Sequence, residues 1–395
     1  MATKTESKDA PMRPKSLEEV KQSLRERLAN RGNPMRHCDA AEATAAIEQL
    51  NGLEGDPWAA AWSQAASKFE RAAEQAEARG DAKAAEEAHF KAYAFYYVGR
   101  YPCPNHPKKE ECARKAREHF VAASRFFDPP LEKLVIPFEG RPGEGKDIVL
   151  YLRKPKGLKR PPVVVNWGGV DGYKEERYEN GKAILAAGMA TVAMDMPGTG
   201  ESPMVGAIDG ERQFETVFRW VQQQPELDGS SIGIVGSSFG GYWATKVAHV
   251  YRHYLKAAVN WGGGIHYNFQ TDWLIKSRYA DSYLMDLAAS RALTFKLYSY
   301  DEYAAFAPRL SLLDQGLLDQ PCAPLLLING KEDKQVPIED FYLLMEHGDP
   351  KSVRVFPGGH MGQSPSTLPT IVRWLAERLG AAPHPTLSPV GRGKG

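Results

Sequence analysis

The sequence predicts an α/β protein with a mostly parallel sheet, preceded by an all-helical domain. Helical patterns fill the chain up to Asp128-Pro129-Pro130, and short apolar runs of strand length replace them afterwards. These later runs are rich in β-branched residues and alternate with helical segments, which is typical of a sheet covered by helices on both faces. At 395 residues the chain is also longer than one compact core usually requires, so we expect two domains.

Residues 16–130 are expected to form the helical domain. Ser16 and Glu19 make a capping-box pattern at the start of the first helix. Asp56, followed by proline, predicts the N-cap of a longer helix that ends at a glycine. Two more helical patterns follow, at 81–99 and 107–127. Such paired helices resemble tetratricopeptide hairpins, but the sequence shows no convincing internal repeat.

Residues 131–380 are expected to form the α/β domain, in which the apolar runs have strand length. These runs are residues 133–138, 147–155, 161–167, 190–196, 231–236, 256–261, 324–330 and 353–358. Residues 265–320 interrupt the alternation with a helical segment rich in Tyr, Phe and Trp, which we interpret as an insertion above the sheet. The two ends of the chain, 1–15 and 381–395, are poor in apolar residues and are expected to be disordered.

The stretch GSSFG at 236–240 follows an apolar strand run and precedes a helical pattern. It matches the G-x-S-x-G pattern of a nucleophilic serine held in a sharp strand-to-helix turn, where larger neighbours would clash. Ser238 is the candidate nucleophile because, unlike Ser237, it has glycine two positions before it and two positions after it. The alternative interpretation is an ordinary glycine turn.

A serine nucleophile needs a histidine base, and the histidine needs a carboxylate that orients it. In this class of fold the chain order is serine, acid, histidine. The loop after the run 324–330 carries Glu332 and Asp333, and His360 follows the last strand run in a glycine-rich loop. Asp333 is preferred to Glu332 because it lies in the middle of its loop, before the next expected helix. The alternatives are a helix-capping aspartate and a turn histidine.

Two backbone N–H groups must bind the oxyanion that forms during acyl transfer. One is expected from Phe239, the residue after the serine. The other is expected from Gly169 or Val170, because the loop WGGVD at 167–171 follows a strand run and resembles an HGGG-type oxyanion loop. The alternative for this loop is a tight turn without a catalytic part.

The overall composition argues against several classes of partner. The formal net charge is +1, which gives no field that would favour nucleic acid or an acidic membrane. No apolar run has the length of a membrane span, and the N-terminus lacks the apolar core of a signal peptide. Four cysteines without a C-x-x-C motif are typical of the cytoplasm. His249 and His253 have the spacing of a metal pair but no third ligand nearby, so we expect no metal and no cofactor.

Several motifs together resemble the α/β-hydrolase superfamily over residues 131–380. They are GSSFGG at 236–241, KEDKQVP at 331–337 and GGHMG at 358–362. The helical domain followed by WGGVDGYKEE, DMPGTGES and NWGGG is similar to one branch of that superfamily, which contains 2,6-dihydropseudooxynicotine hydrolase, fungal polyketide-shortening hydrolases and fermentation-respiration-switch esterase-like proteins. The resemblance implies an α/β-hydrolase fold. It also implies a homodimer, since relatives with a helical N-terminal domain often dimerise.

The resemblance implies two chemistries on one set of catalytic residues. Some members hydrolyse esters, and others hydrolyse a carbon–carbon bond next to a ketone. In the nicotine-pathway hydrolase, a glutamate just after the Trp-Gly-Gly segment assists catalysis. The matching stretch of this chain, residues 262–272, has no glutamate and offers His266, Gln270 and Asp272 instead.

We therefore expect a cofactor-free serine hydrolase that cleaves an ester of an aromatic or hydrophobic acyl group through an acyl-enzyme. A carbon–carbon hydrolase acting on a ketone or β-diketone-like substrate is the alternative, and a non-enzymatic binding module is a third hypothesis. The helical domain, as a lid, and the insertion are expected to form a largely apolar pocket over Ser238. The candidate lining residues are Trp167, Trp261, His266, Tyr267, Phe269 and Trp273.

Overall fold

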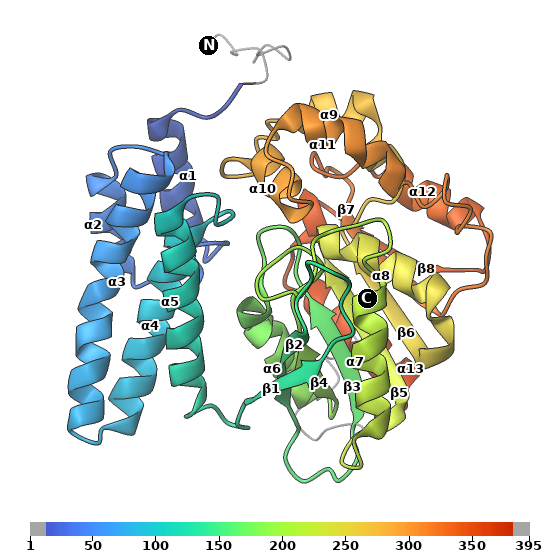
Figure 1. Ribbon diagram of the computed structural model, residues 1–395, viewed down its shortest axis with the longest axis horizontal. Helices are drawn as coiled ribbons and strands as arrows, with labels where there is room; N and C mark the ends of the chain where they lie inside the picture. Colours follow the sequence, from blue (N-terminus) through green and yellow to red (C-terminus); the bar gives the residue numbers. More distant parts are fainter. Residues whose placement is uncertain (1–12, 382–395) are drawn as a thin grey trace, which may run out of the picture.

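The computed structural model describes residues 13–381, in which a helical N-terminal part stands beside a sheet with helices on both faces (Figure 1). The helical part lies on the side of the sheet where β1 and β2 are found. Its helices are α1 (Leu17–Ala29), α2 (Ala40–Gln49), α3 (Gly55–Ala78), α4 (Ala82–Arg100) and α5 (Pro107–Ser124). The first strand begins only after α5 ends, so the N-terminal part is all helical, and helices are interspersed with strands in the rest of the described chain.

Aromatic side chains of α3 and α4 build the core of the helical part. Trp58 and Trp62 of α3 are fully buried, and the ring centroid of Trp62 lies 6.3 Å from that of Phe95 on α4. The start of α3 differs from the sequence expectation, because the helix begins at Gly55 and Asp56 lies in its first turn rather than at the N-cap. An acidic side chain in the first turn still stabilises the helix, since the helix N-terminus carries partial positive charge.

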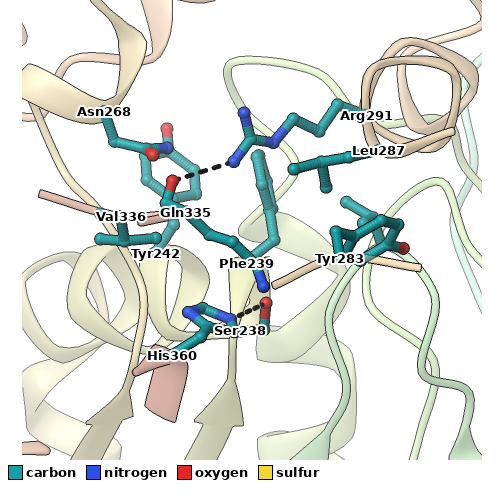
Figure 2. A pocket seen from close by; sticks show the side chains of 12 residues that line it. Ser238, Phe239, Tyr242, Asn268, Tyr283, Leu287, Arg291, Gln335, Val336 and His360 are labelled. Carbon is teal, nitrogen blue, oxygen red and sulfur yellow. Dashed lines mark hydrogen bonds between the residues drawn. The ribbon is translucent and has the colours of Figure 1, made fainter. Parts of the chain in front are cut away.

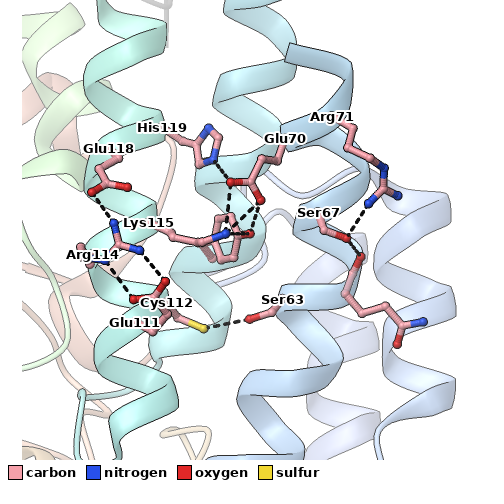
Figure 3. A network of polar contacts seen from close by, with 12 residues as sticks. Ser63, Ser67, Glu70, Arg71, Glu111, Cys112, Arg114, Lys115, Glu118 and His119 are labelled. Atoms are coloured by element: carbon pink, nitrogen blue, oxygen red, sulfur yellow. Dashed lines mark hydrogen bonds and ion pairs between the residues drawn. The ribbon is translucent and has the colours of Figure 1, made fainter. Parts of the chain in front are cut away.

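A polar cluster around Glu70 joins three of these helices (Figure 3). The Glu70 carboxylate on α3 accepts hydrogen bonds from the Tyr96 hydroxyl of α4 at 2.7 Å and from Lys115 Nζ of α5 at 3.1 Å. His119 Nε2, also on α5, lies 3.4 Å from the same carboxylate. Burial raises the pKa of Glu70, but the bonds from Tyr96 and Lys115 outweigh burial and lower it. The carboxylate is therefore ionised at neutral pH and holds α3, α4 and α5 together.

The sheet has the strand order β1-β2-β4-β3-β5-β6-β7-β8. Strand β2 is antiparallel to both of its neighbours, β1 and β4, and the other neighbouring pairs are parallel. The strands are β1 (Glu132–Pro137), β2 (Asp147–Arg153), β3 (Pro162–Trp167), β4 (Ala190–Ala193), β5 (Asp228–Ser237), β6 (Leu255–Trp261), β7 (Leu325–Gly330) and β8 (Ser352–Phe356). The predicted mostly parallel α/β fold is confirmed.

Both faces of the central strands are buried, which explains why their sequences are continuous apolar runs. In β3, Val164 packs on the side covered by α6 and α13, whereas Val163 and Val165 pack on the side covered by α7, α8 and α12. Successive side chains of a strand point to opposite faces, so a single strand serves both cores. The covering helices are α6 (Tyr178–Ala186), α7 (Arg212–Gln223), α8 (Phe239–Val250), α12 (Glu339–Glu346) and α13 (Thr367–Leu379).

Between β6 and β7 the chain forms short helices that lie above the sheet in Figure 1. They are α9 (Thr271–Ser277), α10 (Leu287–Thr294) and α11 (Tyr300–Phe306). Lys15 reaches this segment from the other end of the chain, where its Nζ donates to the carbonyls of Asp281 at 2.6 Å and Tyr283 at 2.8 Å. The expectation of disorder was therefore wrong for residues 13–15. The rest of the expected disordered ends, except residue 381, lies outside the described residues.

Three negative findings apply to residues 13–381. None of the helices there is both long and apolar enough to cross a lipid bilayer. No group of three or more His, Cys, Asp or Glu side chains within this range is arranged to hold a metal ion. The four cysteines are free thiols, and three of them are buried.

A histidine of the helical part provides a prediction about stability. The ring of His37 packs edge-on against Phe90 with centroids 5.2 Å apart, and burial lowers the pKa of His37 from 6.5 to about 4. The stability that depends on neutral His37 is therefore complete above pH 6.5 and is lost progressively as the pH falls toward 4. We expect the urea midpoint to fall more between pH 7.5 and pH 5 in the native protein than in His37→Gln. Equal losses in the two proteins would contradict this assignment.

Candidate active site

Ser238 lies at the turn between β5 and α8, and its backbone is held in an unusual conformation. Its φ is 56° and its ψ is −129°, a region that costs energy for a residue with a side chain. A Cβ added at Gly236 would lie 2.0 Å from the Gly240 carbonyl oxygen, and one added at Gly240 would lie 2.3 Å from the Gly168 oxygen. Both glycines of the G-x-S-x-G motif are therefore required by close backbone contacts.

The structure brings the three side chains predicted from sequence into one chain of hydrogen bonds. His360 Nε2 lies 2.8 Å from Ser238 Oγ, and His360 Nδ1 lies 2.7 Å from Asp333 Oδ2. Figure 2 shows the serine–histidine contact from close by. The three residues follow β5, β7 and β8, which run parallel, so their carboxyl ends meet at the same edge of the sheet. This arrangement can pass the serine proton to the imidazole and hold the charge that results.

Asp333 is surrounded by hydrogen-bond donors although its side chain has no solvent exposure. Its carboxylate accepts bonds from the Gln335 and Val336 amides at 2.7 and 3.2 Å, as well as from His360. Burial raises the pKa of Asp333, but His360 and the hydrogen bonds outweigh burial and hold the pKa below its ordinary value. The carboxylate is thus ionised at neutral pH, as an orienting partner of the histidine must be.

Asn329, at the end of β7, is a positioning residue that the sequence argument missed. Its Nδ2 donates to Asp333 Oδ2 at 2.9 Å, and its Oδ1 accepts from the amide of Met361 at 2.8 Å. One fully buried side chain thereby joins the loop of the acid to the loop of the histidine. The signal available in the sequence was a polar residue within the apolar run that forms β7, because a buried amide must find partners.

The loop after β3 runs directly beside the serine. A Cβ added at Gly169 would lie 2.8 Å from Ser238 Cβ and 3.2 Å from the Phe239 nitrogen. Phe239 is the first residue of α8, so its N–H has no partner within the helix. Among residues 13–381, the amides of Phe239, Gly169 and Val170 donate no hydrogen bond. These free donors, next to the positive end of a helix dipole, form a place where a negatively charged oxygen would be stabilised.

Helix α4 of the helical part holds this loop from the other side. The guanidinium of Arg100 lies between the rings of Tyr97 and Tyr173, 4.2 and 3.9 Å from their centroids. It donates to the Asp171 carbonyl at 2.6 Å and to the Glu176 carboxylate at 2.9 Å. We call these five residues the α4 clamp. Arg100 is 1% exposed, and its charge is paired with Glu176 inside the protein. Because breaking a buried ion pair is costly, the clamp fixes the loop that follows β3.

Two adjacent cavities reach Ser238. The larger, with a volume of about 350 Å³, opens between the helical part and the α/β part, and Arg27, Asn33 and Tyr101 of the helical part line it. The smaller, of about 20 Å³, is narrower and is bordered by Phe239 and α10. The residues that border both cavities are Ser238, Tyr283, Gln335 and His360. The expected largely apolar pocket is thus only partly present, because polar and apolar atoms contribute comparable shares of the wall of the larger cavity.

None of the six aromatic and histidine residues proposed to line the pocket borders either cavity. Trp167 is fully buried behind the serine turn, where its Nε1 donates to the Gly240 carbonyl at 2.9 Å. Phe269 is also fully buried, and Trp261 donates from Nε1 to the Met361 carbonyl at 2.7 Å. These three rings pack the protein around the site rather than facing a ligand.

The other three residues lie farther along the insertion. His266 Nδ1 is 2.7 Å from Ser311 Oγ. Tyr267 and Trp273 line a separate surface groove, together with Gln270 and Asp272. The prediction for the pocket was therefore wrong in detail, because aromatic residues in a helical segment can face either the core or the solvent. The insertion residues that do border the smaller cavity include Asn268, Tyr283, Leu287 and Arg291.

Comparisons with known proteins place these features in context. The family model described as Esterase FrsA-like matches residues 37–380. Hydrolase phmG of Phaeosphaeria nodorum is 30% identical over 249 residues, covering 57% of this chain and 56% of that protein. The 2,6-dihydropseudooxynicotine hydrolase of Paenarthrobacter nicotinovorans is 29% identical over 208 residues, covering 52% of this chain and 55% of that protein. The chain thus spans about half the length of these curated relatives.

A solved structure covers more of the chain. The crystal structure of the 2,6-dihydroxy-pseudo-oxynicotine hydrolase matches 91% of this chain and 96% of its own, with a TM-score of 0.74. The sequence identity over this match is 22%, so the likeness concerns the fold. It extends across both the helical part and the sheet.

The close contacts at the serine turn lead to a prediction about stability. Replacing Gly236 with alanine is expected to lower the free energy of unfolding by about 3 kcal/mol, because the new Cβ would collide with backbone rather than with a movable side chain. Gly359→Ala is the matched control, since nothing lies within 4 Å of a Cβ added there. We expect that control to change stability by no more than about 0.5 kcal/mol. Urea unfolding measures both, and similar effects would contradict the proposed contact.

Proposed function

The chain belongs to the FrsA-like esterase family, and from that premise we propose that it is a serine hydrolase that cleaves a carboxylic ester through an acyl-enzyme. The family match bears out the resemblance predicted from the motifs. The observation that carries the proposal is the continuous hydrogen-bond chain from Ser238 Oγ through His360 to Asp333, with contacts of 2.8 and 2.7 Å.

In the first half of the reaction, Ser238 Oγ attacks the carbonyl carbon of the ester while His360 Nε2 takes its proton. Asp333 holds the opposite ring nitrogen and stabilises the positive imidazolium. The negative charge that develops on the carbonyl oxygen is stabilised by the amide of Phe239 and by that of Gly169 or Val170. His360 then gives its proton to the departing alcohol, which leaves the acyl group on Ser238.

In the second half, water replaces the alcohol. His360 takes a proton from this water as its oxygen attacks the acyl carbon, and the same amides stabilise the second oxyanion. Breakdown of that intermediate returns the proton to Ser238 Oγ and releases the carboxylic acid. The free enzyme is restored with its starting charges.

The cavities favour a substrate with an aromatic or hydrophobic body. Tyr101, Tyr283 and Leu287 provide aromatic and apolar wall around Ser238. The larger cavity, at about 350 Å³, is within the range of pockets that hold small organic molecules. The polar residues in its wall, among them Asn33, Gln335 and Gln363, suit hydroxyl, keto or charged groups on the same substrate.

The ester is preferred to a carbon–carbon bond for one reason. The residues that could have supplied the acidic group implied by the nicotine-pathway resemblance, His266, Gln270 and Asp272, do not border the cavities at Ser238. His360 carries a proton after the attack in both reactions, but a carbanion is a much poorer leaving group than an alkoxide, so carbon–carbon cleavage depends more on an additional acid near the leaving carbon.

The nucleophile and the base can be tested directly. A fluorophosphonate probe is expected to label the native protein and not Ser238→Ala. His360→Ala is expected to lower kcat for a phenyl ester by roughly a thousandfold or more, the scale of such deletions in other serine hydrolases. Mass spectrometry of products from paired ester and β-diketone substrates distinguishes the two bond types. Near-normal turnover by His360→Ala would refute the assigned base, and labelling of Ser238→Ala would refute the nucleophile.

The α4 clamp gives a second test. Glu176→Gln keeps the size of the side chain but leaves Arg100 with a buried, unpaired charge, so the loop carrying Gly169 and Val170 is expected to lose its fixed position. We expect kcat to fall by about tenfold to a hundredfold with a smaller change in KM, because the donors act mainly on the transition state. Glu42→Gln, which breaks the exposed pair with Lys68 elsewhere in the helical part, is the control. A change in KM with kcat unaltered in Glu176→Gln would contradict this role. Equal losses of kcat in Glu176→Gln and Glu42→Gln would also contradict it.

A further inference from the structure

Arg291 is a buried cation that the proposed reaction does not use. It lies on α10 and is 6% exposed. Its Nη1 donates to Ser277 Oγ and its Nη2 donates to the Gln335 carbonyl, each at 3.1 Å. Both acceptors are neutral, and no carboxylate within residues 13–381 lies within 4.0 Å of the guanidinium. A guanidinium has five N–H donors, so some of its capacity remains unused.

A buried charge without a partner is costly, and two buried cations of this protein, Lys174 and Arg100, have carboxylate partners. Lys174 lies within 3.2 Å of three carboxylates, and Arg100 is paired with Glu176. Arg153 and Lys109 are also buried without a carboxylate of residues 13–381 within salt-bridge distance, but they border neither cavity at Ser238. Placing a cation in a site of low polarity is expensive unless an anion or several hydrogen bonds accompany it. An unpaired guanidinium beside a reactive serine therefore points to an anion that arrives with the ligand.

Arg291 lies where such an anion could bind close to the reactive serine. The side chain borders the same narrow cavity as Ser238 and His360. In Figure 2 its guanidinium extends toward Gln335, past the ring of Phe239, with Ser238 and His360 at the opposite end of the group. The cavity has a volume of only about 20 Å³, so it admits a small terminal group, while the body of a ligand occupies the larger cavity next to it.

The charged residues that line the larger cavity are less suited than Arg291 to bind an anion of the ligand. Arg27 lies there and, like Arg291, donates within residues 13–381 only to neutral oxygens, which are the main-chain carbonyls of Asn33 and Ser282. Arg27 is partly exposed, however, so solvent stabilises its charge. Asp171 is the one carboxylate among the lining residues of that cavity, and its backbone carbonyl belongs to the α4 clamp. Arg291 is thus the cation that is both buried and directed at the narrow end of the site.

We propose that Arg291 binds a carboxylate of the substrate, so that the enzyme selects esters that carry a second, ionised acid group. A carboxylate is planar and small, and it can accept two parallel N–H bonds from one guanidinium. The proposal rests on the proposed ester hydrolysis, and it narrows the substrate class. Arg291 also joins α10 to the loop of Asp333 through the Gln335 carbonyl, so a test must separate charge recognition from support of that loop.

The test compares kcat/KM for two pairs of esters that differ mainly in one carboxylate. Phenyl hydrogen adipate and phenyl hexanoate place the group on the acyl side, and 4-acetoxybenzoate and 4-methylphenyl acetate place it on the alcohol side. We expect the native enzyme to prefer the carboxylate member of at least one pair by about tenfold or more. Arg291→Gln is expected to reduce that preference to near one, and Arg291→Lys to retain part of it. The ratio within a pair is insensitive to a general loss of activity, which a purely structural role would cause.

Two further variants serve as a control and as an independent test of the role of Arg291. Arg309→Gln neutralises an exposed arginine of the same insertion that borders neither cavity, and it is expected to leave the preference unchanged. Leu287→Glu places a carboxylate one helical turn before Arg291, where it is expected to pair with the guanidinium and abolish the preference without removing the arginine. This variant keeps the proposal testable if Arg291→Gln does not fold.

The outcomes separate the inference from the proposed function. Hydrolysis of the neutral esters with no carboxylate preference in either pair, or a preference that survives Arg291→Gln or Leu287→Glu, would overturn the role of Arg291 alone. Absence of turnover for all four esters, together with absence of fluorophosphonate labelling, would overturn the serine hydrolase. In that case calorimetric titration of adipate and 4-hydroxybenzoate into the native protein still tests the anion site, and equal affinity in Arg291→Gln would refute it.

Discussion

The close approach of three backbone segments around Ser238 is the constraint on which the rest of the site depends. The end of β5, the start of α8 and the loop after β3 come so near one another that carbonyl oxygens of Gly240 and Gly168 occupy the space where side chains would otherwise stand. This contact forces the serine into its strained conformation and holds its hydroxyl at the open edge of the sheet. His360 can take the proton from Oγ, and the free amides can reach the oxygen of the carbonyl that Oγ attacks, only because Oγ is held in a fixed position.

Several parts of this site could be read from the sequence because they obey strict local rules. The glycines flanking Ser238 are required by backbone contacts, and the parallel strands bring residues 333 and 360 to the same edge as residue 238. The ligand-facing residues followed no such rule. Phe269 and Tyr267 are two positions apart, yet one is fully buried and the other is 42% exposed in a groove of its own. Composition does not show which aromatic side chain faces a cavity, and Arg291 lies in a helix without any motif.

The helical part has a clearer relation to the site than its sequence suggested. It supplies one wall of the larger cavity, and through Arg100 it also determines where the loop after β3 lies. The stretch GYKEE, which looked in the sequence like a family signature without a stated purpose, contains Tyr173 and Glu176, two members of the α4 clamp. The same match that defines the family runs from residue 37 across both parts. A helical part held in this way acts as a structural component of the site.

The dipeptide Asn329-Gly330 has a consequence for the chemical stability of the protein during storage or long use. Asparagine is required there by its two hydrogen bonds, and glycine is required because a Cβ at position 330 would lie 2.0 Å from the Gly359 oxygen. Asparagine followed by glycine is the dipeptide that deamidates most readily wherever the backbone is free to cyclise. In this protein, deamidation of Asn329 would place a second carboxylate beside Asp333 and remove the Nδ2 donor that binds the Asp333 carboxylate. The pairing of β7 with its neighbouring strands keeps the backbone extended at Asn329, and it therefore protects this residue from deamidation.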